Sequence, residues 1–486
     1  MATIFVSLGA LFLFFNYNKS ISELLVSYFS GFAAFISTII ISLVLIGSIN
    51  FMFVVSLFLI LLLGNAYVQR ARLASNVRHI PTIVLPAIGV WIVSLTVVFV
   101  AREANLVSWH SDSFQYLRVA ALIAEDNFDM MNRNLAEQRM ISTPAMHFLS
   151  FYFDEHYARS AAPLVSVSII SIIVFTALFY FGGSFLKNWK QLIAVGVSIL
   201  FLVSINRFVF HSFYVNGHLL LAACVLAIAA NVVLLASGRS GSRPFAYILI
   251  GASIMVACFT RPEGFMLAAL ALGPLMLWPG VPAREKLLIA GWYLICGLLL
   301  SYFLISVYAA GGHASPLRNY AAPVAGLGLM FAALISNLAI VKAYHRHMLH
   351  LAEAAVWLSL AVLALMSPAL FWASLQATYT NALGGAGAWG YGFVLLYVLF
   401  YIFALTYRSD DFLPLRFAAS TTVPILFMLV FTRTSPYRVG DGDSFSRMLI
   451  EAVPLMVLFI ALAAANDRWG LPFMKTRKRK EAPDRA

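Results

Sequence analysis

The chain has 486 residues, 62% of them hydrophobic and only 11% charged, and its formal net charge is +12. A soluble domain has no use for so much apolar surface, so the composition excludes soluble protein classes and predicts a membrane protein. The excess of Lys and Arg does not indicate nucleic-acid binding, because these residues gather in short segments between apolar runs, as in cytoplasmic loops. The three cysteines lie within apolar runs and indicate neither a disulfide framework nor a metal cluster.

Apolar runs of the length that a helix needs to cross a bilayer recur along the whole chain. The runs are continuously apolar rather than alternating, which favours helices over a β-barrel. We therefore predict an all-α polytopic membrane protein with about 13–15 transmembrane helices. The predicted spans are 3–16, 24–46, 49–66, 82–100, 161–185, 190–206, 218–236, 245–259, 264–279, 287–309, 322–342, 351–374, 390–407, 415–432 and 447–465.

The basic residues set the predicted orientation of these spans. The tail 467–486 is rich in Lys and Arg at 475–480, so it is expected to stay in the cytoplasm. Counting spans back from this tail places basic residues in nearly every loop on the same side. The sequence therefore predicts a cytoplasmic C-terminus and an external location for the long polar segment 101–160.

The segment 101–160 is polar and rich in carboxylates, whereas the sequence around it is apolar. Residues 113–125 have a helical pattern, with Phe114, Leu117, Ala121 and Leu122 on one face. A helix of this kind lies along a membrane surface. We therefore predict two or three short amphipathic helices packed on the outer face rather than a soluble domain.

Asp112 lies near the start of this segment, two residues after His110. A carboxylate at the outer mouth of a helix bundle can take a proton from an acceptor hydroxyl, and with His110 it can also bind a divalent cation. The alternative interpretation is a solvated aspartate, or an N-cap for the helix that begins near residue 113. Asp154 and Glu155, near the end of the segment, are second candidates for the base.

Two external turns carry polar residues that can bind a substrate. Arg261 and Glu263 lie in a tight turn between two apolar spans, where Arg261 can bind a phosphate and Glu263 can orient it. The alternative is an interfacial turn with a local ion pair. Tyr214 and His218 lie in another short turn before a span, where they are donors for a sugar or phosphate or simply interfacial residues.

Three arginines lie in the last external loop, although basic residues are usually in excess on the cytoplasmic side. They are Arg433, Arg438 and Arg447. An anionic lipid phosphate explains them, because the guanidinium group offers a rigid bidentate fork. The alternative is local neutralisation by Asp441 and Asp443.

Three pieces of this sequence resemble the GT-C superfamily of integral-membrane glycosyltransferases. They are the segment 110–117 with Asp112, the segment 260–265 with Arg-Pro-Glu-Gly, and the segment 446–454 with Arg447 and a proline. The chain departs from the family pattern in two ways: about three spans precede the core, and the loop has no Asp-x-Asp. The missing Asp-x-Asp favours a metal-free enzyme that uses a polyprenyl-phosphate sugar, with no certain cofactor and a divalent cation left open.

The resemblance implies a division of the chain into four parts. Residues 1–81 are additional N-terminal transmembrane helices, and residues 82–310 are a GT-C-like catalytic core that includes the external loop 101–160. Residues 311–466 are C-terminal transmembrane helices, and residues 467–486 are a basic cytoplasmic tail.

The resemblance also implies a function. A glycosyltransferase of a bacterial inner membrane moves a sugar from a polyprenyl-phosphate donor to a glycan, lipid-linked or protein acceptor on the external face, with inversion. Asp112 is the expected general base, and Arg261, Arg438 and Arg447 are expected to bind the donor phosphate. The expected substrate-binding residues are His110, Tyr214, His218 and Glu263. The expected partners are the donor, the acceptor and membrane lipids, and no nucleic acid.

Two other functions are compatible with a polytopic chain. An O-antigen polymerase or ligase also acts on undecaprenyl-linked glycans, but its large functional loop comes late in the chain rather than early. A lipid or polysaccharide transporter has polar residues in mid-span and broken helices in repeated halves. No internal repeat is visible in this sequence.

Overall fold

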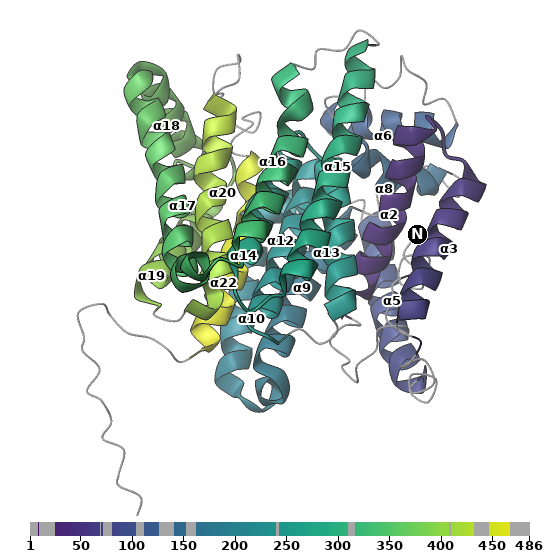
Figure 1. Cartoon of the computed structure of the whole chain (residues 1–486), viewed down its shortest axis with the longest axis horizontal. Helices are drawn as coiled ribbons and strands as arrows, with labels where there is room; N and C mark the ends of the chain where they lie inside the picture. Colours follow the sequence, from purple (N-terminus) through teal and green to yellow (C-terminus); the bar gives the residue numbers. More distant parts are fainter. Residues whose placement is uncertain are drawn as a thin grey trace, which may run out of the picture.

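The computed structural model describes residues 8, 25–68, 70, 80–103, 111–125, 140–151, 162–239, 243–309, 316–407, 410–431 and 447–466. Every regular element within these ranges is a helix, and most of the long helices run side by side as a bundle (Figure 1). This confirms the prediction of an all-α polytopic membrane protein. The elements are α2 (Ser27–Leu45), α3 (Phe51–Val68), α5 (Ile80–Glu103), α6 (Ser111–Ala124), α8 (Ser142–Phe151), α9 (Pro163–Phe181), η3 (Gly182–Lys187), α10 (Trp189–Ser204), α11 (Asn206–Ser212), α12 (Gly217–Ala236), α13 (Arg243–Cys258), α14 (Gly264–Leu277), α15 (Ala283–Ala309), α16 (Pro316–Ile335), α17 (Ala339–Met366), α18 (Pro368–Ala382), α19 (Gly390–Thr406), η4 (Asp410–Phe412), α20 (Leu413–Phe431), η5 (Leu449–Glu451) and α22 (Val453–Ala465).

Six helices within the described residues are long and apolar enough to cross a bilayer, or seven if α10 and α11 form one span with a bend of 76°. Eight further helices have apolar stretches of 10–17 described residues, and α13 and α14 are among them. The count of 13–15 spans refers to the whole chain and stays a prediction.

The helix α12 forms the centre of the bundle. It packs against α9, α13, α14, α20 and α22, and 94% of its span is buried. A helix that is apolar on every side is stable in lipid or among other helices, and α12 has helices around it. Its many alanines allow neighbouring backbones to come close. In lipid there is no hydrophobic driving force between helices, so close van der Waals packing of this kind holds them together.

The N-terminal helices lie on one side of this bundle, at the right of Figure 1. Helix α2 packs against α13 and α15, and α3 packs against α2. The part of the chain that precedes the predicted core is therefore joined to it mainly through α13.

Segment 101–160 contains two short helices, α6 and α8, which pack against each other near the upper end of the bundle in Figure 1. Phe114, on the predicted membrane-facing side of α6, is 54% exposed on the protein. The buried side chains are Tyr116, Val119, Ala120 and Ile123. These follow helical spacing on another face of α6, which packs on the protein.

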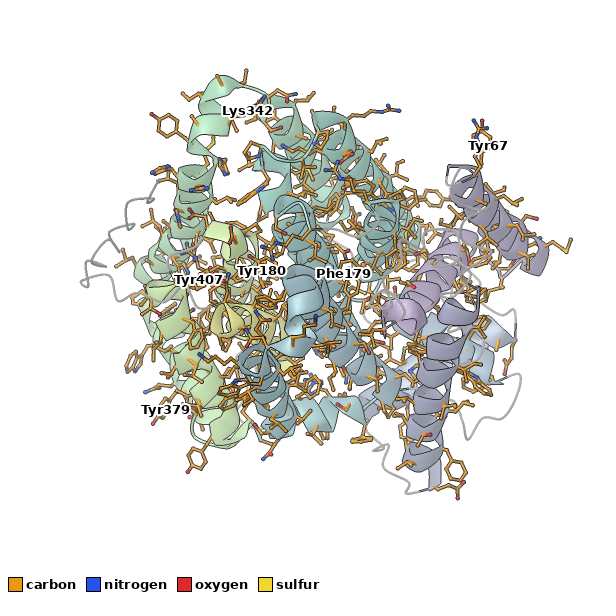
Figure 2. The ribbon with its side chains drawn as sticks, turned by 90° about the horizontal axis from the view of Figure 1, so that it is seen from below. Tyr67, Phe179, Tyr180, Lys342, Tyr379 and Tyr407 are labelled. Carbon is orange, nitrogen blue, oxygen red and sulfur yellow. The ribbon has the colours of Figure 1, made fainter. Side chains whose placement is uncertain are left out.

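The lower end of the bundle, seen in Figure 2, is held by aromatic and polar contacts. The Tyr180 hydroxyl donates to Asp411 Oδ2 at 3.1 Å, and the Arg239 guanidinium donates to the Tyr180 carbonyl. The Phe412 ring lies between Tyr180 and Tyr407, at centroid distances of 4.6 and 5.4 Å. These contacts tie the C-terminal ends of α9 and α12 to η4.

Candidate functional site

Four charged or titratable side chains meet at the upper end of α12. His218 lies in the first turn of α12, Arg261 and Glu263 lie in the turn between α13 and α14, and Glu451 ends η5. We call these four residues the Arg261 cluster. The cluster brings together three residues that the sequence predicted as binding residues, Arg261, Glu263 and His218, with Glu451, which it did not.

The sequence before α12 positions His218. The Asn216 side chain caps the helix, because its Oδ1 accepts a hydrogen bond from the His218 amide at 2.8 Å. Gly217 follows the cap, and a Cβ at this position would lie 3.0 Å from both Arg261 Cγ and the Thr260 carbonyl oxygen. The glycine therefore allows the first turn of α12 to approach the turn that carries Arg261.

The turn at residues 259–263 is equally tight. The Thr260 hydroxyl donates to the Val256 carbonyl at 2.5 Å, and the Gly264 amide donates to the Arg261 carbonyl at 2.9 Å. A Cβ on Gly264 would lie 1.9 Å from the Ala257 carbonyl oxygen, so only glycine fits. Local sequence thus folds α13 directly back into α14 and presents Arg261 and Glu263 toward α12.

Glu451 links the two halves of the cluster. Its Oε1 lies 2.8 Å from His218 Nδ1 and 3.9 Å from Arg261 Nε, and Arg261 Nε also lies 2.6 Å from Glu263 Oε1. An ionised carboxylate can only accept, so Nδ1 of His218 carries the proton in this contact. One carboxylate therefore holds a histidine and an arginine that come from different parts of the chain.

The cluster is almost entirely removed from solvent. The exposed fractions of the side chains are 0% for Glu451, 2% for Glu263, 3% for His218 and 11% for Arg261. Burial alone lowers the pKa of the Arg261 guanidinium, but the nearby acidic groups, Glu263 first among them, raise its pKa above the ordinary value. Arg261 is therefore a permanent positive charge, and it compensates carboxylates that are costly to bury alone.

A divalent cation has a potential set of ligands here. The ligand atoms of His218, Glu263 and Glu451 all lie within 4.8 Å of one another. However, the Arg261 guanidinium already contacts both carboxylates. A cation would have to displace a bound guanidinium, so this donor set is better suited to holding Arg261 than to holding a metal.

A second group of basic side chains surrounds His211, which is 1% exposed. Its Nδ1–H donates to the Arg207 carbonyl at 2.8 Å, and its ring meets the His218 ring edge to face at 5.9 Å. The charges of Arg207, Arg447 and Arg261 all act on this ring. The predicted phosphate-binding residues Arg261 and Arg447 therefore belong to one positively charged region.

The helix that carries Asp112 begins next to this region. The Ser113 hydroxyl donates to the Val215 carbonyl at 3.3 Å, in the loop that leads into α12. Tyr116 packs with Val215, and its hydroxyl interacts electrostatically with Arg261. The first turn of α6 is thus a neighbour of the Arg261 cluster, although the side chain of Asp112 lies outside the described residues.

The remaining predicted residues divide into two groups. Tyr214 is 2% exposed and lies beside the region, with its ring 5.8 Å from that of His211. The others lie outside the described residues, namely His110, Asp154, Glu155 and Arg438. Their predicted roles stay predictions.

Glu451 and Arg207 are the main residues that the sequence prediction missed. Glu451 is the only charged residue in the stretch 448–465, and Arg207 follows the apolar run 190–206. A lone ionisable residue in such a stretch is expensive in a membrane and therefore marks a functional or structural site. Applied to Glu451, that rule predicts that this carboxylate has a polar or charged partner.

No protein-family model, no curated protein and no solved structure matches this chain. The function of this region is therefore argued from its own geometry and chemistry.

Proposed function

We propose that the protein is a GT-C-like glycosyltransferase of a bacterial inner membrane, which transfers a sugar from a polyprenyl-phosphate donor to a glycan, lipid-linked or protein acceptor on the external face. The observation that carries this proposal is the Arg261 cluster beside the first turn of α6. It joins a fixed guanidinium, buried carboxylates and the helix with the predicted base at one end of a membrane bundle.

Arg261 is suited to bind the donor phosphate. Both of its ion pairs use Nε, so they orient the guanidinium without involving its two terminal nitrogens. Those nitrogens can donate to phosphate oxygens, and Arg447 adds a second positive charge in the same region. A preorganised cation of this kind stabilises the negative charge that develops on the departing lipid phosphate. Arg438 is a further proposed ligand.

Asp112 is the proposed general base. It would take the proton of the acceptor hydroxyl while the hydroxyl oxygen bonds to the anomeric carbon. The bond from that carbon to the phosphate oxygen breaks at the same time, and its electron pair leaves with the polyprenyl phosphate. One direct displacement inverts the anomeric configuration. In this scheme His218, Glu263 and Glu451 position Arg261.

The proposal is tested with the purified full chain, a set of polyprenyl-phosphate sugars and candidate acceptors, by measuring release of polyprenyl phosphate. We expect release from wild type, and a large loss for Asp112→Asn and for Arg261→Lys. Asp410→Asn is a matched carboxylate control, since Asp410 is 40% exposed and pairs with Arg346 far from the cluster. If Asp112→Asn releases polyprenyl phosphate at the wild-type rate, Asp112 is not the general base. If wild type releases no polyprenyl phosphate from any donor, the proposed function is wrong.

A transporter is the second candidate, because one observation favours it. The pair α10 and α11 is bent by 76° at Ile205, and broken helices are typical of substrate sites in transporters. Proteoliposomes that contain a labelled lipid-linked sugar and no acceptor separate the two functions. Movement of the intact lipid-linked sugar between leaflets would favour transport, whereas acceptor-dependent release of the lipid phosphate would favour transfer.

A further inference from the structure

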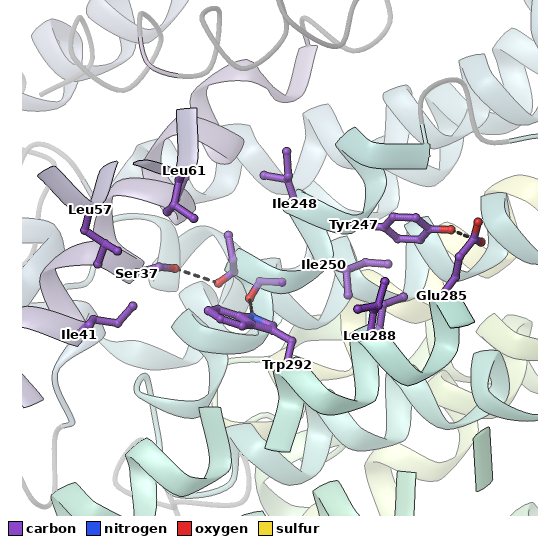
Figure 3. Close-up of a pocket in the computed structure, with 14 residues that line it drawn as sticks. Ser37, Ile41, Leu57, Leu61, Tyr247, Ile248, Ile250, Glu285, Leu288 and Trp292 are labelled. Carbon is purple, nitrogen blue, oxygen red and sulfur yellow. Dashed lines mark hydrogen bonds between the residues drawn. The ribbon is translucent and has the colours of Figure 1, made fainter. Parts of the chain in front are cut away.

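An apolar groove runs along the seam between the N-terminal helices and the core (Figure 3). Its volume is about 490 Å³, within the range of roughly 300–1,000 Å³ that is common for ligand sites. Its walls come from α2, α3, α13 and α15, and include Ile41, Leu57, Leu61, Ile248, Leu288 and Trp292. Its α13 residues lie between Tyr247 and Ala252, whereas Arg261 follows the C-terminal end of that helix.

The polar atoms along the middle of the groove are already bonded within the protein. The Trp292 indole N–H donates to the Gly251 carbonyl at 2.9 Å, and the Ser37 hydroxyl donates to the Ala33 carbonyl at 2.7 Å. What remains facing the groove is hydrocarbon. Water has no partners in such a space, so an apolar chain is the fitting occupant.

The groove is open to the side rather than enclosed. Leu61 on α3 is 42% exposed, and Leu288 on α15 is 65% exposed. In a membrane protein this surface faces lipid tails, so an acyl chain can enter laterally. Along α15 the groove extends over seven residues, from Glu285 to Trp292, which corresponds to about 10 Å of helix.

One end of the groove is charged. The Tyr247 hydroxyl donates to the Glu285 carboxylate, and Arg243 Nη1 lies 3.0 Å from Glu285 Oε1. Arg243 is 45% exposed, and Arg284, the neighbour of Glu285 at the start of α15, is also exposed. Glu285 lines the groove and pairs with Arg243, and Arg284 adds one positive charge at the preceding position of α15.

We propose that this groove binds one anionic phospholipid. One of its two acyl chains lies between α2–α3 and α13–α15, and its phosphate lies at Arg243 and Arg284. The hydrocarbon wall does not discriminate between lipids, because moving a lipid tail from the bilayer into another apolar environment changes its free energy little. The selectivity for a negative headgroup comes from the arginines, as in basic pockets between membrane helices. The bound lipid fills the seam that joins the N-terminal helices to the core.

The test uses native mass spectrometry on the purified full chain with added phosphatidylglycerol or phosphatidylcholine of identical acyl chains. Wild type is expected to retain one phosphatidylglycerol in preference to phosphatidylcholine. The double variant Arg243→Gln with Arg284→Gln is expected to lose about 30-fold of that preference, given a contribution of about 1 kcal/mol from each basic residue near a lipid phosphate. Leu61→Trp, at the exposed rim, is expected to lower retention of both lipids.

Two matched variants control for general effects. Arg346→Gln removes an exposed arginine that pairs with Asp410 on other helices, and Leu358→Trp enlarges a leucine of α17 that is 65% exposed. Both are expected to retain lipid like wild type. Equal retention by Leu61→Trp and wild type would overturn the groove as the site. An unchanged headgroup preference in the double arginine variant would overturn the choice of an anionic lipid.

Discussion

The ion pairs at the two ends of the bundle differ in how much of each side chain is exposed. At the upper end the Arg261 cluster contains side chains with exposed fractions of 0–11%. At the lower end the pairs Arg243–Glu285 and Arg346–Asp410 have exposed fractions of 23–52%. The Tyr180–Asp411 contact and the Arg239 bond to Tyr180 belong to the lower end as well.

This difference separates two kinds of ion pair. Exposed pairs contribute about 0–1 kcal/mol, because water solvates their charges in any case. Buried pairs must recover a large desolvation penalty, and apolar residues in the same place would often be more stable. Two buried carboxylates held together with an arginine and a histidine are thus weak evidence for a stabilising role. The upper end is therefore the better candidate for function.

The largest effect is expected for Glu451→Ala. It removes the acceptor of His218 and a partner of Arg261, and it leaves buried polar groups without compensation. We expect a loss of about 3–5 kcal/mol in the free energy of unfolding, measured by denaturation in detergent. Glu451→Gln, which keeps the shape and one acceptor oxygen, is the control and should lose less. Equal stability of Glu451→Ala and wild type would mean that the cluster is not an interdependent unit.

Arg261→Lys is expected to affect activity more than folding. Lysine keeps the positive charge but not the planar fork, so it cannot bind Glu263 and a phosphate together. We expect release of polyprenyl phosphate to fall about 10²–10³-fold, the usual effect of removing one preorganised donor. Arg243→Lys, at the lower end, is the comparison variant and should release polyprenyl phosphate at the wild-type rate. Similar losses in both variants would remove the functional distinction between the two ends.

Gly264→Ala tests the backbone that supports the cluster. The added Cβ would lie 1.9 Å from the Ala257 carbonyl oxygen, so the turn must shift. We expect a loss of about 1–3 kcal/mol, typical of overpacking, in the same denaturation experiment. Gly273→Ala on the same helix is the matched control, because a Cβ there meets nothing within 4 Å. Equal stabilities of the two variants would contradict the tight turn.

The smallest effect is expected for Arg346→Ala. Its partner Asp410 lies 2.5 Å away, but the two side chains are 52% and 40% exposed. We expect a change within about 1 kcal/mol, and a smaller change at high salt, by thermal unfolding at two ionic strengths. A loss as large as that of Glu451→Ala would show that exposure does not separate the two ends.

Sequence alone predicted the helical character of this molecule and the helix that begins near residue 113. It also named Arg261, Glu263 and His218, which the structure brings together. The sequence did not predict which face of α6 packs on the protein, because tertiary packing rather than local amphipathicity buries Tyr116 and Ile123. Hydropathy alone also does not distinguish a complete crossing from a short buried helix such as α14.

The meeting of Glu451 with His218 is beyond such patterns. It requires α22 to pack against α12, and no local spacing relates the two residues. Only the general rule that an isolated charge in an apolar stretch needs a partner indicates that Glu451 has one. The rule does not say which residue that partner is.

The contact between His218 and Glu451 joins positions that are 233 residues apart in the chain. During synthesis, the first turn of α12 and the Arg261 turn enter the membrane long before Glu451 has been translated. Until η5 and α22 arrive, Arg261 has only Glu263 as its carboxylate partner within the cluster. The site is therefore completed only after residue 451 has been translated, and a chain that stops before it lacks the carboxylate that contacts both His218 and Arg261.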